Sequence, residues 1–544
     1  MSMNKTYESM SVADHDNGSP SNIQKIAVAI SSIGLVILSL ALLNLEFSHK
    51  AIWLTVALLA IILGIFIYAN DLYLKQPAGI KFNGVWFKSL TSRGMLAWIL
   101  GILLTLFYII IYWFPQYLGY QDKGVNTGIV SLFDPLSIFL NGKPATQWFL
   151  YGTLYSVAIL AMGYKFILKY RDNKYQVVRT LSVMFFQLGF AFLIPEILSK
   201  LNPDTPYFNK DIKNMWPLNY YFFEEWHLTN MFSSGNLGIF MLVSGLLMIL
   251  VISPVLTYFY GKRWYCSWVC GCGGLAETAG DPFRHLSDKS SKAWKFERWC
   301  IHLVLVFAFI MSVAVLYTFL GNNPALDLIT RRQFTIGIVV FLAILTGSLY
   351  LFKRKKMDKD AVFTMVSLVV IMIGIIMLNH FSGNENLFFI DNYTLTSWYG
   401  FIIGALFSGV IGVGFYPIMG NRVWCRFGCP MAAILGLQQR LFSRFRITTN
   451  GGQCISCGNC SNACEMGIDV RAYAQKGENI VRSSCVGCGI CSAVCPRGVL
   501  KLENGIEDNR INENPVLLGN DLNLLALLRQ ENSLKTINTT RTIL

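Results

Sequence analysis

Long apolar runs recur along this chain and limit the folds open to it more than any other feature. An apolar run of about twenty residues has the length that spans a bilayer as an α-helix. We place ten such runs, at about 26–45, 51–70, 95–114, 148–168, 180–198, 236–260, 300–320, 335–352, 362–382 and 399–419. Only 14% of the 544 residues are charged, which is too few for a soluble chain of this length. The sequence therefore predicts a polytopic α-helical membrane protein with about ten transmembrane helices.

Lysine and arginine are distributed unevenly among the segments between these runs. They concentrate in 75–93, 165–179 and 353–359, whereas 382–398 contains neither residue type. Because an excess of Lys and Arg marks cytoplasmic loops, this alternation predicts cytoplasmic N- and C-termini. The net charge of +14 follows from the loop pattern, and nothing in it predicts nucleic-acid binding.

All fourteen cysteines lie at or after Cys266. On the predicted topology, each is inside the cell or at the inner edge of the membrane. That compartment is normally reducing, so metal ligation is favoured over disulfide bonds. One set of cysteines follows the last apolar run, and a second set lies where two of the apolar runs end.

The first set lies in a polar, glycine-rich segment, 446–503, with two runs of four cysteines spaced C-x2-C-x2-C-x3-C. This is the spacing of bacterial ferredoxins, in which three cysteines of a run bind one cubane and the fourth ligates the other. The sequence therefore predicts a ferredoxin α+β domain with two [4Fe–4S] clusters. One cluster takes Cys454, Cys457, Cys460 and Cys495, and the other takes Cys485, Cys488, Cys491 and Cys464. Structural zinc fits less well, because zinc usually takes four ligands as two separated pairs.

The two cysteine runs differ in the residue that follows them. Pro496 follows the second run, whereas Glu465 follows the first. Proline shapes the turn and is not a ligand, so we expect both clusters to bind. Paired clusters exchange electrons without a substrate pocket, which indicates an electron relay. Such clusters have potentials from roughly −700 to +450 mV, so the spacing leaves the direction of electron flow open.

The second set of cysteines follows the pattern R-x-aromatic-C-x-aromatic-x-C, which occurs twice, each time after an apolar run. The first copy contains Cys266 and Cys270, and the second contains Cys425 and Cys429. Cysteines four apart share one face if a helix continues through them, so two such ends could present four thiolates to each other. The candidate chemistries are a third cluster, a copper or iron site, and a reversible thiol pair. The alternative is an interfacial collar of Trp and Arg with incidental thiols.

With these motifs together, the chain resembles membrane polyferredoxins of the NapH/NosR type and the related CcoG/FixG oxidase-assembly proteins. The resemblance covers about 236–500. It implies a multi-pass protein of the bacterial inner membrane that works with respiratory reductase or oxidase subunits, with quinol as a candidate donor. The implied function is electron transfer between the ferredoxin domain and a quinol or metal site in the membrane, in support of a respiratory reductase. The alternative is an assembly factor that reduces copper for oxidase or nitrous oxide reductase biogenesis. Whether the chain is itself an enzyme, a quinol dehydrogenase or a metal reductase, stays open.

The chain departs from the family pattern at three positions near the helix ends. Gly271 stands where the motif has proline, which the second copy retains as Pro430. Cys272 is an additional cysteine, and Cys300 opens the seventh apolar run on the same side. Either thiol is therefore a candidate ligand in place of a family cysteine.

We expect five parts in the chain. They are a polar N-terminal tail (1–22), a five-helix membrane region (23–200), a second five-helix region with both helix-end motifs (201–445), the ferredoxin domain (446–503) and a C-terminal tail (504–544). A predicted outer loop, Leu218 to Phe232, combines aromatic residues with Glu224, Glu225 and His227. Quinol oxidation needs a proton acceptor near a membrane pocket, although an interfacial amphipathic segment explains the loop more simply.

Overall fold

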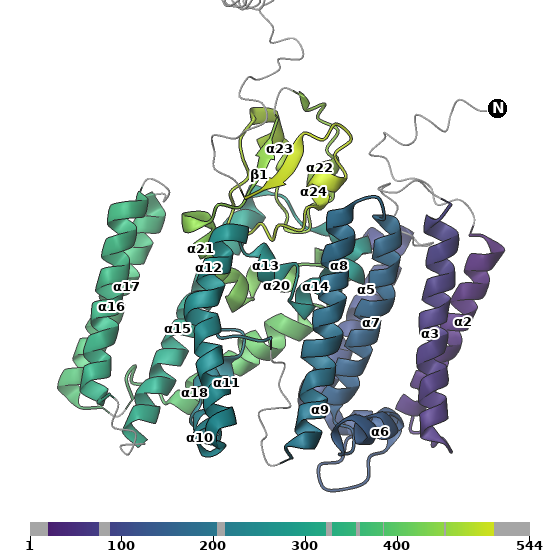
Figure 1. The fold of residues 1–544 in the computed structure, drawn as a ribbon, viewed down its shortest axis with the longest axis horizontal. Coiled ribbons are helices and arrows are strands. Elements are labelled where there is room, and N and C mark those ends of the chain that lie inside the picture. Colours follow the sequence, from purple (N-terminus) through teal and green to yellow (C-terminus); the bar gives the residue numbers. More distant parts are fainter. Residues whose placement is uncertain are drawn as a thin grey trace, which may run out of the picture.

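The structure is a computed structural model that describes residues 20–75, 88–203, 213–322, 329–354, 359–384, 386–450 and 453–504. Within these ranges, nine helices are long and apolar enough to cross a membrane. They are α2 (Asn22–Leu42), α3 (Lys50–Tyr73), α5 (Met95–Trp113), α7 (Gln147–Lys169), the continuous helix α8–η2–α9 (Lys174–Leu201), the continuous helix α11–η5–α12 (Gly235–Tyr260), α15 (Ser291–Asn322), α16 (Arg331–Lys353) and α17 (Lys359–Ser382). The prediction of a polytopic helical membrane protein is confirmed, and Figure 1 shows the long helices standing side by side.

The tenth predicted run, 399–419, is not one straight helix. α18 (Asn392–Tyr399) continues as the π-helical η9 (Gly400–Val410), and the chain then turns. The segment packs closely on α5, because a Cβ atom added at Gly409 would lie 2.5 Å from the ring of Tyr108. Hydrophobicity predicted the apolar run but could not indicate this break.

Short elements fill both ends of the helical layer. They are α4 (Lys88–Thr91), η1 (Pro115–Leu118), α6 (Gly128–Asn141), η4 (Tyr220–Phe223), α10 (Glu225–Ser233), α13 (Arg263–Cys266), α14 (Gly271–Thr278), η6 (Asp281–Leu286), α19 (Tyr416–Met419), α20 (Val423–Phe427) and α21 (Pro430–Phe442). In Figure 1, α13, α14 and α20 lie between the long helices beneath the ferredoxin domain, and α6 and α10 lie at the opposite end.

The ferredoxin domain is small and lies on one end of the helical layer (Figure 1). Its two strands, β1 (Arg446–Thr449) and β2 (Leu500–Glu503), pair antiparallel and bring the ends of the domain together. Between them lie the short helices α22 (Asn459–Asn462), α23 (Val470–Lys476) and α24 (Ile490–Ala493).

The described residues of two basic segments, 165–179 and the start of 353–359, lie at the end of the helical layer that carries the ferredoxin domain. Tyr175, at the start of α8, donates a hydrogen bond to the carbonyl of Gly487 in that domain (2.9 Å). Lys353, at the end of α16, lies over the ring of Phe442 in α21. The alternation of basic loops along the sequence therefore matches the sidedness of the helices.

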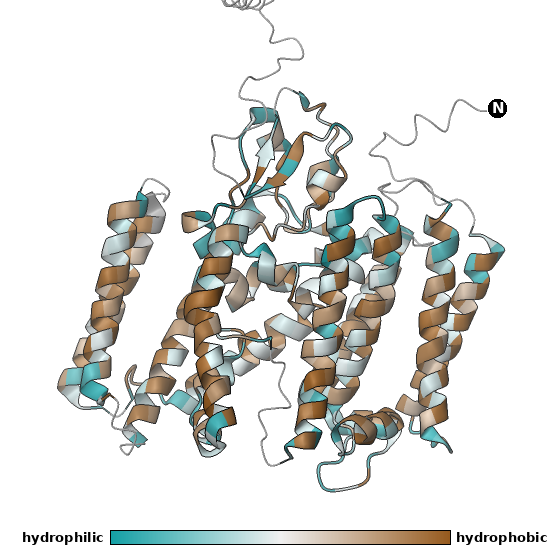
Figure 2. Ribbon diagram, in the orientation of Figure 1, coloured by the Kyte–Doolittle hydropathy of each residue, from teal (hydrophilic) through white to brown (hydrophobic). Residues whose placement is uncertain are grey.

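The long helices keep an apolar exterior. Figure 2 shows hydrophobic residues along the helices and hydrophilic residues at their ends and in the ferredoxin domain. Ile102 and Leu250 are 61% and 69% exposed. Exposing so much apolar side chain to water is unfavourable, so a lipid environment explains these surfaces.

Candidate functional site

The first cysteine run lies on the exposed side of the ferredoxin domain. One hollow of about 20 Å³ is lined by three cysteines of this run, Cys454, Cys457 and Cys460, and by Cys495 of the second run. Burial raises the pKa of Cys460 to about 11, and the thiols of the other three contribute to the rise. The neighbouring Ile455 is 50% exposed, so this hollow lies close to the protein surface.

The other four ferredoxin cysteines lie together: three come from the second run, and Cys464 comes from the first. Burial raises the pKa of Cys491 well above its ordinary value, and the neighbouring thiols of Cys488, Cys464 and Cys485 add to this effect. In both runs, a glycine in the left-handed region (Gly458 and Gly489, φ 77° and 75°) begins the short helix that presents the third cysteine. A side chain would strain that backbone conformation.

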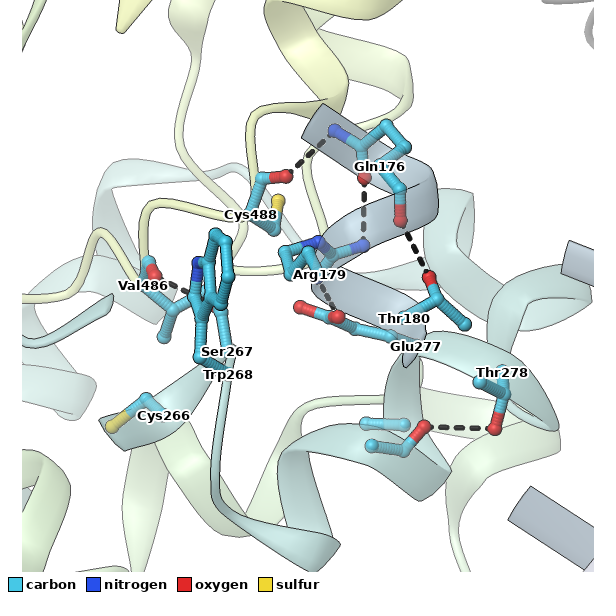
Figure 3. A network of polar contacts seen from close by, with 12 residues as sticks. Gln176, Arg179, Thr180, Cys266, Ser267, Trp268, Glu277, Thr278, Val486 and Cys488 are labelled. Carbon is cyan, nitrogen blue, oxygen red and sulfur yellow. Dashed lines mark hydrogen bonds and ion pairs between the residues drawn. The ribbon is translucent and has the colours of Figure 1, made fainter. Parts of the chain in front are cut away.

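Side chains of the membrane region bind the loop 485–488 through its backbone. Each of its four successive carbonyls accepts a hydrogen bond. The donors, in order along the loop, are Gln439 (2.9 Å), Ser267 (2.8 Å), Tyr175 (2.9 Å) and Gln176 (2.8 Å). Figure 3 shows the second and the fourth of these contacts. A peptide carbonyl and its N–H point in roughly opposite directions, so this arrangement leaves loop amides free to face the thiols. The second run is therefore the membrane-proximal one.

The two helix-end motifs fold alike. The N–H of Cys270 donates to the carbonyl of Tyr265 (2.8 Å), and the N–H of Cys429 donates to that of Trp424 (2.9 Å). In each copy this turn ends a one-turn helix, and the second cysteine becomes the N-cap of the next helix. The condition of one helix continuing through both cysteines is therefore not met. A turn closed by a hydrogen bond between residues five apart stands there in each copy.

Folding brings the four helix-end thiols together. Cys266, Cys270, Cys425 and Cys429 are buried in one core cluster. Burial raises the pKa of Cys429 well above its ordinary value, and the other three thiols add to the rise. Cys300, on α15, does not join this cluster.

The thiol spacing bears on which metal group these cysteines suit. A tetrahedral zinc ion with Zn–S bonds of about 2.3 Å needs sulfurs about 3.8 Å apart. Within the described ranges, the single group of three ligand atoms closer than 4.8 Å to one another is Glu277, Glu465 and Cys488. No described set of three cysteines is that compact. A cubane spreads its thiolates over four iron corners, so the donor sets fit a cluster better than a single ion.

A cavity of about 1260 Å³ reaches the helix-end thiols from within the helical layer. Cys270 and Cys272 line its inner end. Glu224 and Glu225 line it near α10, at the end of the layer away from the ferredoxin domain (Figure 1). The walls are rich in aromatic residues, among them Tyr112, Trp148, Tyr151, Tyr155, Tyr220 and Trp424. Two residues of the predicted outer loop thus face the cavity, whereas His227 is buried beside the carbonyl of Phe222.

Gly271 leaves room at the inner end of this cavity. A Cβ atom there would lie 2.3 Å from Oε1 of Gln187 and 3.4 Å from Nζ of Lys213. Pro430 occupies the equivalent position of the second copy, so the glycine is a real difference between the copies. The sequence indicated this difference but not its consequence.

A buried ion-pair lattice, which the sequence did not reveal, joins the helix ends to the ferredoxin domain. Its members come from α7, α8, α14, η6, the start of α20 and the ferredoxin domain. They are Lys169, Arg179, Glu277, Asp281, Arg284, Arg422 and Glu465. Burial acts to raise the pKa of Glu465, but Arg284 and Arg422 lower it to about 2. Figure 3 shows Arg179 and Glu277 beside Cys488.

Comparison with known proteins supports the cluster chemistry. A family model described as a 4Fe-4S dicluster domain matches residues 453–500. Another, described as a 4Fe-4S binding domain, matches 243–292 and 400–448, which contain the two helix-end motifs. A provisionally named electron transport protein of Escherichia coli (strain K12), YccM, is 26% identical over 224 residues, which is 41% of this chain and 47% of that protein. No solved structure matches the chain significantly.

These findings establish the general class of the protein. The chain is a multi-pass membrane protein with two [4Fe–4S] clusters, and the matches support electron transfer through them. The predicted pair of clusters is thereby confirmed. The match covers about half the length of the curated relative.

Proposed function

We propose that this chain carries electrons in the bacterial inner membrane, between its ferredoxin domain and a quinol site at the helix-end thiols, in support of a respiratory reductase. This is the role implied by the NapH/NosR-type resemblance. Described residues of the basic segments lie at the same end of the helices as the ferredoxin domain, which supports a cytoplasmic location for that domain and both termini. Each cluster, when bound, accepts or releases one electron at a time.

The proposed order of the centres follows the geometry of their ligands. The distal cluster uses Cys454, Cys457, Cys460 and Cys495, whose hollow lies close to the protein surface. The proximal cluster uses Cys464, Cys485, Cys488 and Cys491, whose loop is bound by membrane side chains. A soluble partner would therefore exchange electrons with the distal cluster first.

A third cluster on the helix-end cysteines would continue this path. The two helix-end motifs, which fold alike, supply four buried thiols: Cys266, Cys270, Cys425 and Cys429. Cys272 lies two residues beyond Cys270 and faces the cavity, which makes it a candidate substitute ligand. Cys300 lies outside the thiol cluster and is the weakest candidate.

One observation supports the proposed function most directly: the large cavity ends at Cys270 and Cys272. Its aromatic walls suit a flat ring, and Gln187 and Lys213 at the inner end offer polar groups to ring oxygens. A quinol bound there would lie against the thiol centre. The protons released by its oxidation would leave along the cavity, whose other end is lined by Glu224 and Glu225.

A test of this proposal uses purified full-length protein and a water-soluble quinol. Quinol-dependent bleaching of the clusters is expected in the wild type and lost in Gly271→Pro, because the ring would displace Gln187. Gly347→Ala is the control, since its Cβ atom would meet nothing within 4 Å. Iron and acid-labile sulfide should exceed about eight of each per chain, and Cys425→Ser should lose the excess. Clusters that never respond to quinol would refute the quinol site.

The cavity also favours a second candidate, an assembly factor that reduces a metal ion. The thiols at one end would suit a soft cation such as Cu(I), and the carboxylates near the other end would attract a cation by their negative charge. In that case, dithionite-reduced protein should reduce Cu(II) and not exchange electrons with quinol. Carboxamide variants at Glu224 and Glu225 should then slow copper reduction.

A further inference from the structure

Glu465 stands at the centre of the contact between the ferredoxin domain and the helix ends. Its side chain is wholly buried. Oε1 lies 3.0 Å from Nη2 of Arg422, and Oε2 lies 3.1 Å from Nη1 of Arg284. Its carbonyl accepts a hydrogen bond from Ser287 (2.7 Å). The residue that replaces proline after the first cysteine run is therefore held by the membrane region on both its side chain and its backbone.

Arg422 contacts both motif copies and the ferredoxin domain at once. Its Nη1 lies 3.6 Å from Sγ of Cys425 and 3.5 Å from the carbonyl of Cys266. Its Nη2 pairs with Glu277 and with Glu465. Arg263, the equivalent residue of the first copy, instead donates to Asn504 (2.9 Å). The two arginines thus have different roles despite the repeat.

The lattice reaches sulfur atoms at both ends. The carboxylates of Glu277 and Glu465 lie within 4.8 Å of Sγ of Cys488, a proposed ligand of the proximal cluster. At the other end, Arg422 contacts the sulfur of Cys425. A short series of buried charges therefore spans the space between the two sets of thiols. Buried charges are screened weakly, so each acts strongly on a neighbouring redox centre.

We propose that Arg422 and Glu465 form a charge bridge between the proximal cluster and the helix-end thiols. This charge bridge holds the two together and sets the reduction potential of the helix-end centre. Both are positioning residues and neither is a ligand. Cluster potentials depend on nearby charge and on hydrogen bonds to the sulfurs. The positive guanidinium stabilises the more negative, reduced state, and the carboxylate opposes it.

A metal ion bound by Glu277, Glu465 and Cys488 is the competing explanation of this cluster. Both carboxylates already pair with arginines: Glu277 with Arg179 and Arg422, and Glu465 with Arg284 and Arg422. Those positive charges would repel a cation, and so the charge bridge accounts for the arrangement better.

The test is a redox titration of the full-length protein in detergent, followed by electron paramagnetic resonance. Arg422→Gln should shift the potential of the helix-end centre downward, and Glu465→Gln should shift it upward. Arg422→Lys keeps the charge and should return the potential toward the wild-type value. Asp71→Asn is the control, because it removes a buried, ion-paired carboxylate (with Lys75) at a distant site and should shift nothing.

A merely structural role would not shift the reduction potential in opposite directions in Arg422→Gln and Glu465→Gln. Shifts of the same sign in Arg422→Gln and Glu465→Gln, or no shift in either at wild-type iron content, would overturn the bridge. If Glu465→Gln does not accumulate, the comparison of Arg422→Gln with Arg422→Lys decides the question. The inference rests on the proposed helix-end centre. If the iron content excludes that centre, the same opposite shifts are expected at the proximal cluster. Absence of the helix-end centre can therefore be distinguished from failure of the charge bridge.

Discussion

Gln439 joins three parts of the protein, so its replacement tests how the ferredoxin domain is held. Its side chain is 1% exposed. It accepts a hydrogen bond from the N–H of Lys262 (2.8 Å) and donates to the carbonyls of Arg482 (2.8 Å) and Cys485 (2.9 Å). Gln439→Leu keeps the approximate volume and removes all three hydrogen bonds. The buried N–H of Lys262 and the buried carbonyl of Cys485 lose these partners, whereas the part-buried carbonyl of Arg482 still accepts from the N–H of Cys485 (3.1 Å).

The expected cost follows from those two buried groups. Each buried polar group that loses its partner costs about 1–3 kcal/mol, and the added apolar surface returns about 1–2 kcal/mol. A net loss of about 2.5 kcal/mol, the middle of these ranges, should favour separation of the proximal loop from the helix ends. Since about 1.4 kcal/mol is a factor of ten, the separated state should become roughly a hundredfold more populated.

Hydrogen exchange of the amides in 485–491 measures that population. We expect Gln439→Leu to lower their protection about a hundredfold, with the absorbance of the clusters retained in the folded fraction. Gln438→Leu is the matched control, because Oε1 of this adjacent glutamine is buried without a hydrogen-bond partner. Protection within about threefold of wild type in Gln439→Leu would refute the argument.

Three further predictions follow from the same contacts. Cys300→Ser should leave the iron and sulfide content unchanged, as measured by chemical analysis, because this thiol lies outside the helix-end cluster. Burial opposes ionisation of Asp281, but Lys169 and Arg284 lower its pKa below the ordinary 3.8. Its stabilising effect is therefore full above pH 3.8 and lost as pH falls through the lower folded value, so the denaturation midpoint of Asp281→Asn should depend less on pH below about 4. The lattice is buried and weakly screened, so 1 M salt should not increase hydrogen exchange in the proximal loop.

The sequence predicted the long helices well because a bilayer allows few alternatives. Backbone groups in lipid must satisfy one another, so an apolar run of sufficient length becomes a helix almost regardless of its neighbours. The run at 399–419 differed, and in it Gly409 packs against Tyr108 through a contact between residues far apart in the chain, which hydrophobicity does not indicate. α6 is too short for the same rule, and its place at one end of the layer could not be predicted.

The candidate site was predictable where spacing alone defines chemistry. Two runs of C-x2-C-x2-C-x3-C place thiols around clusters by local geometry, and the family models agree with that interpretation. The lattice was not predictable, because Arg179, Glu277 and Glu465 lie in separate segments and each looks like an ordinary loop or helix-end charge. Only the fold reveals that these charges are buried together.

Two departures from repetition mark the two ends of the proposed electron path. Gly271 replaces the proline of the second motif copy and leaves space for Gln187 where the cavity meets the thiols. Glu465 replaces the proline of the second cysteine run and pairs with Arg422 where the ferredoxin domain meets the same thiols. Each exchange gives one copy a contact that its partner lacks, so the duplicated motifs contribute unequal halves to a single path.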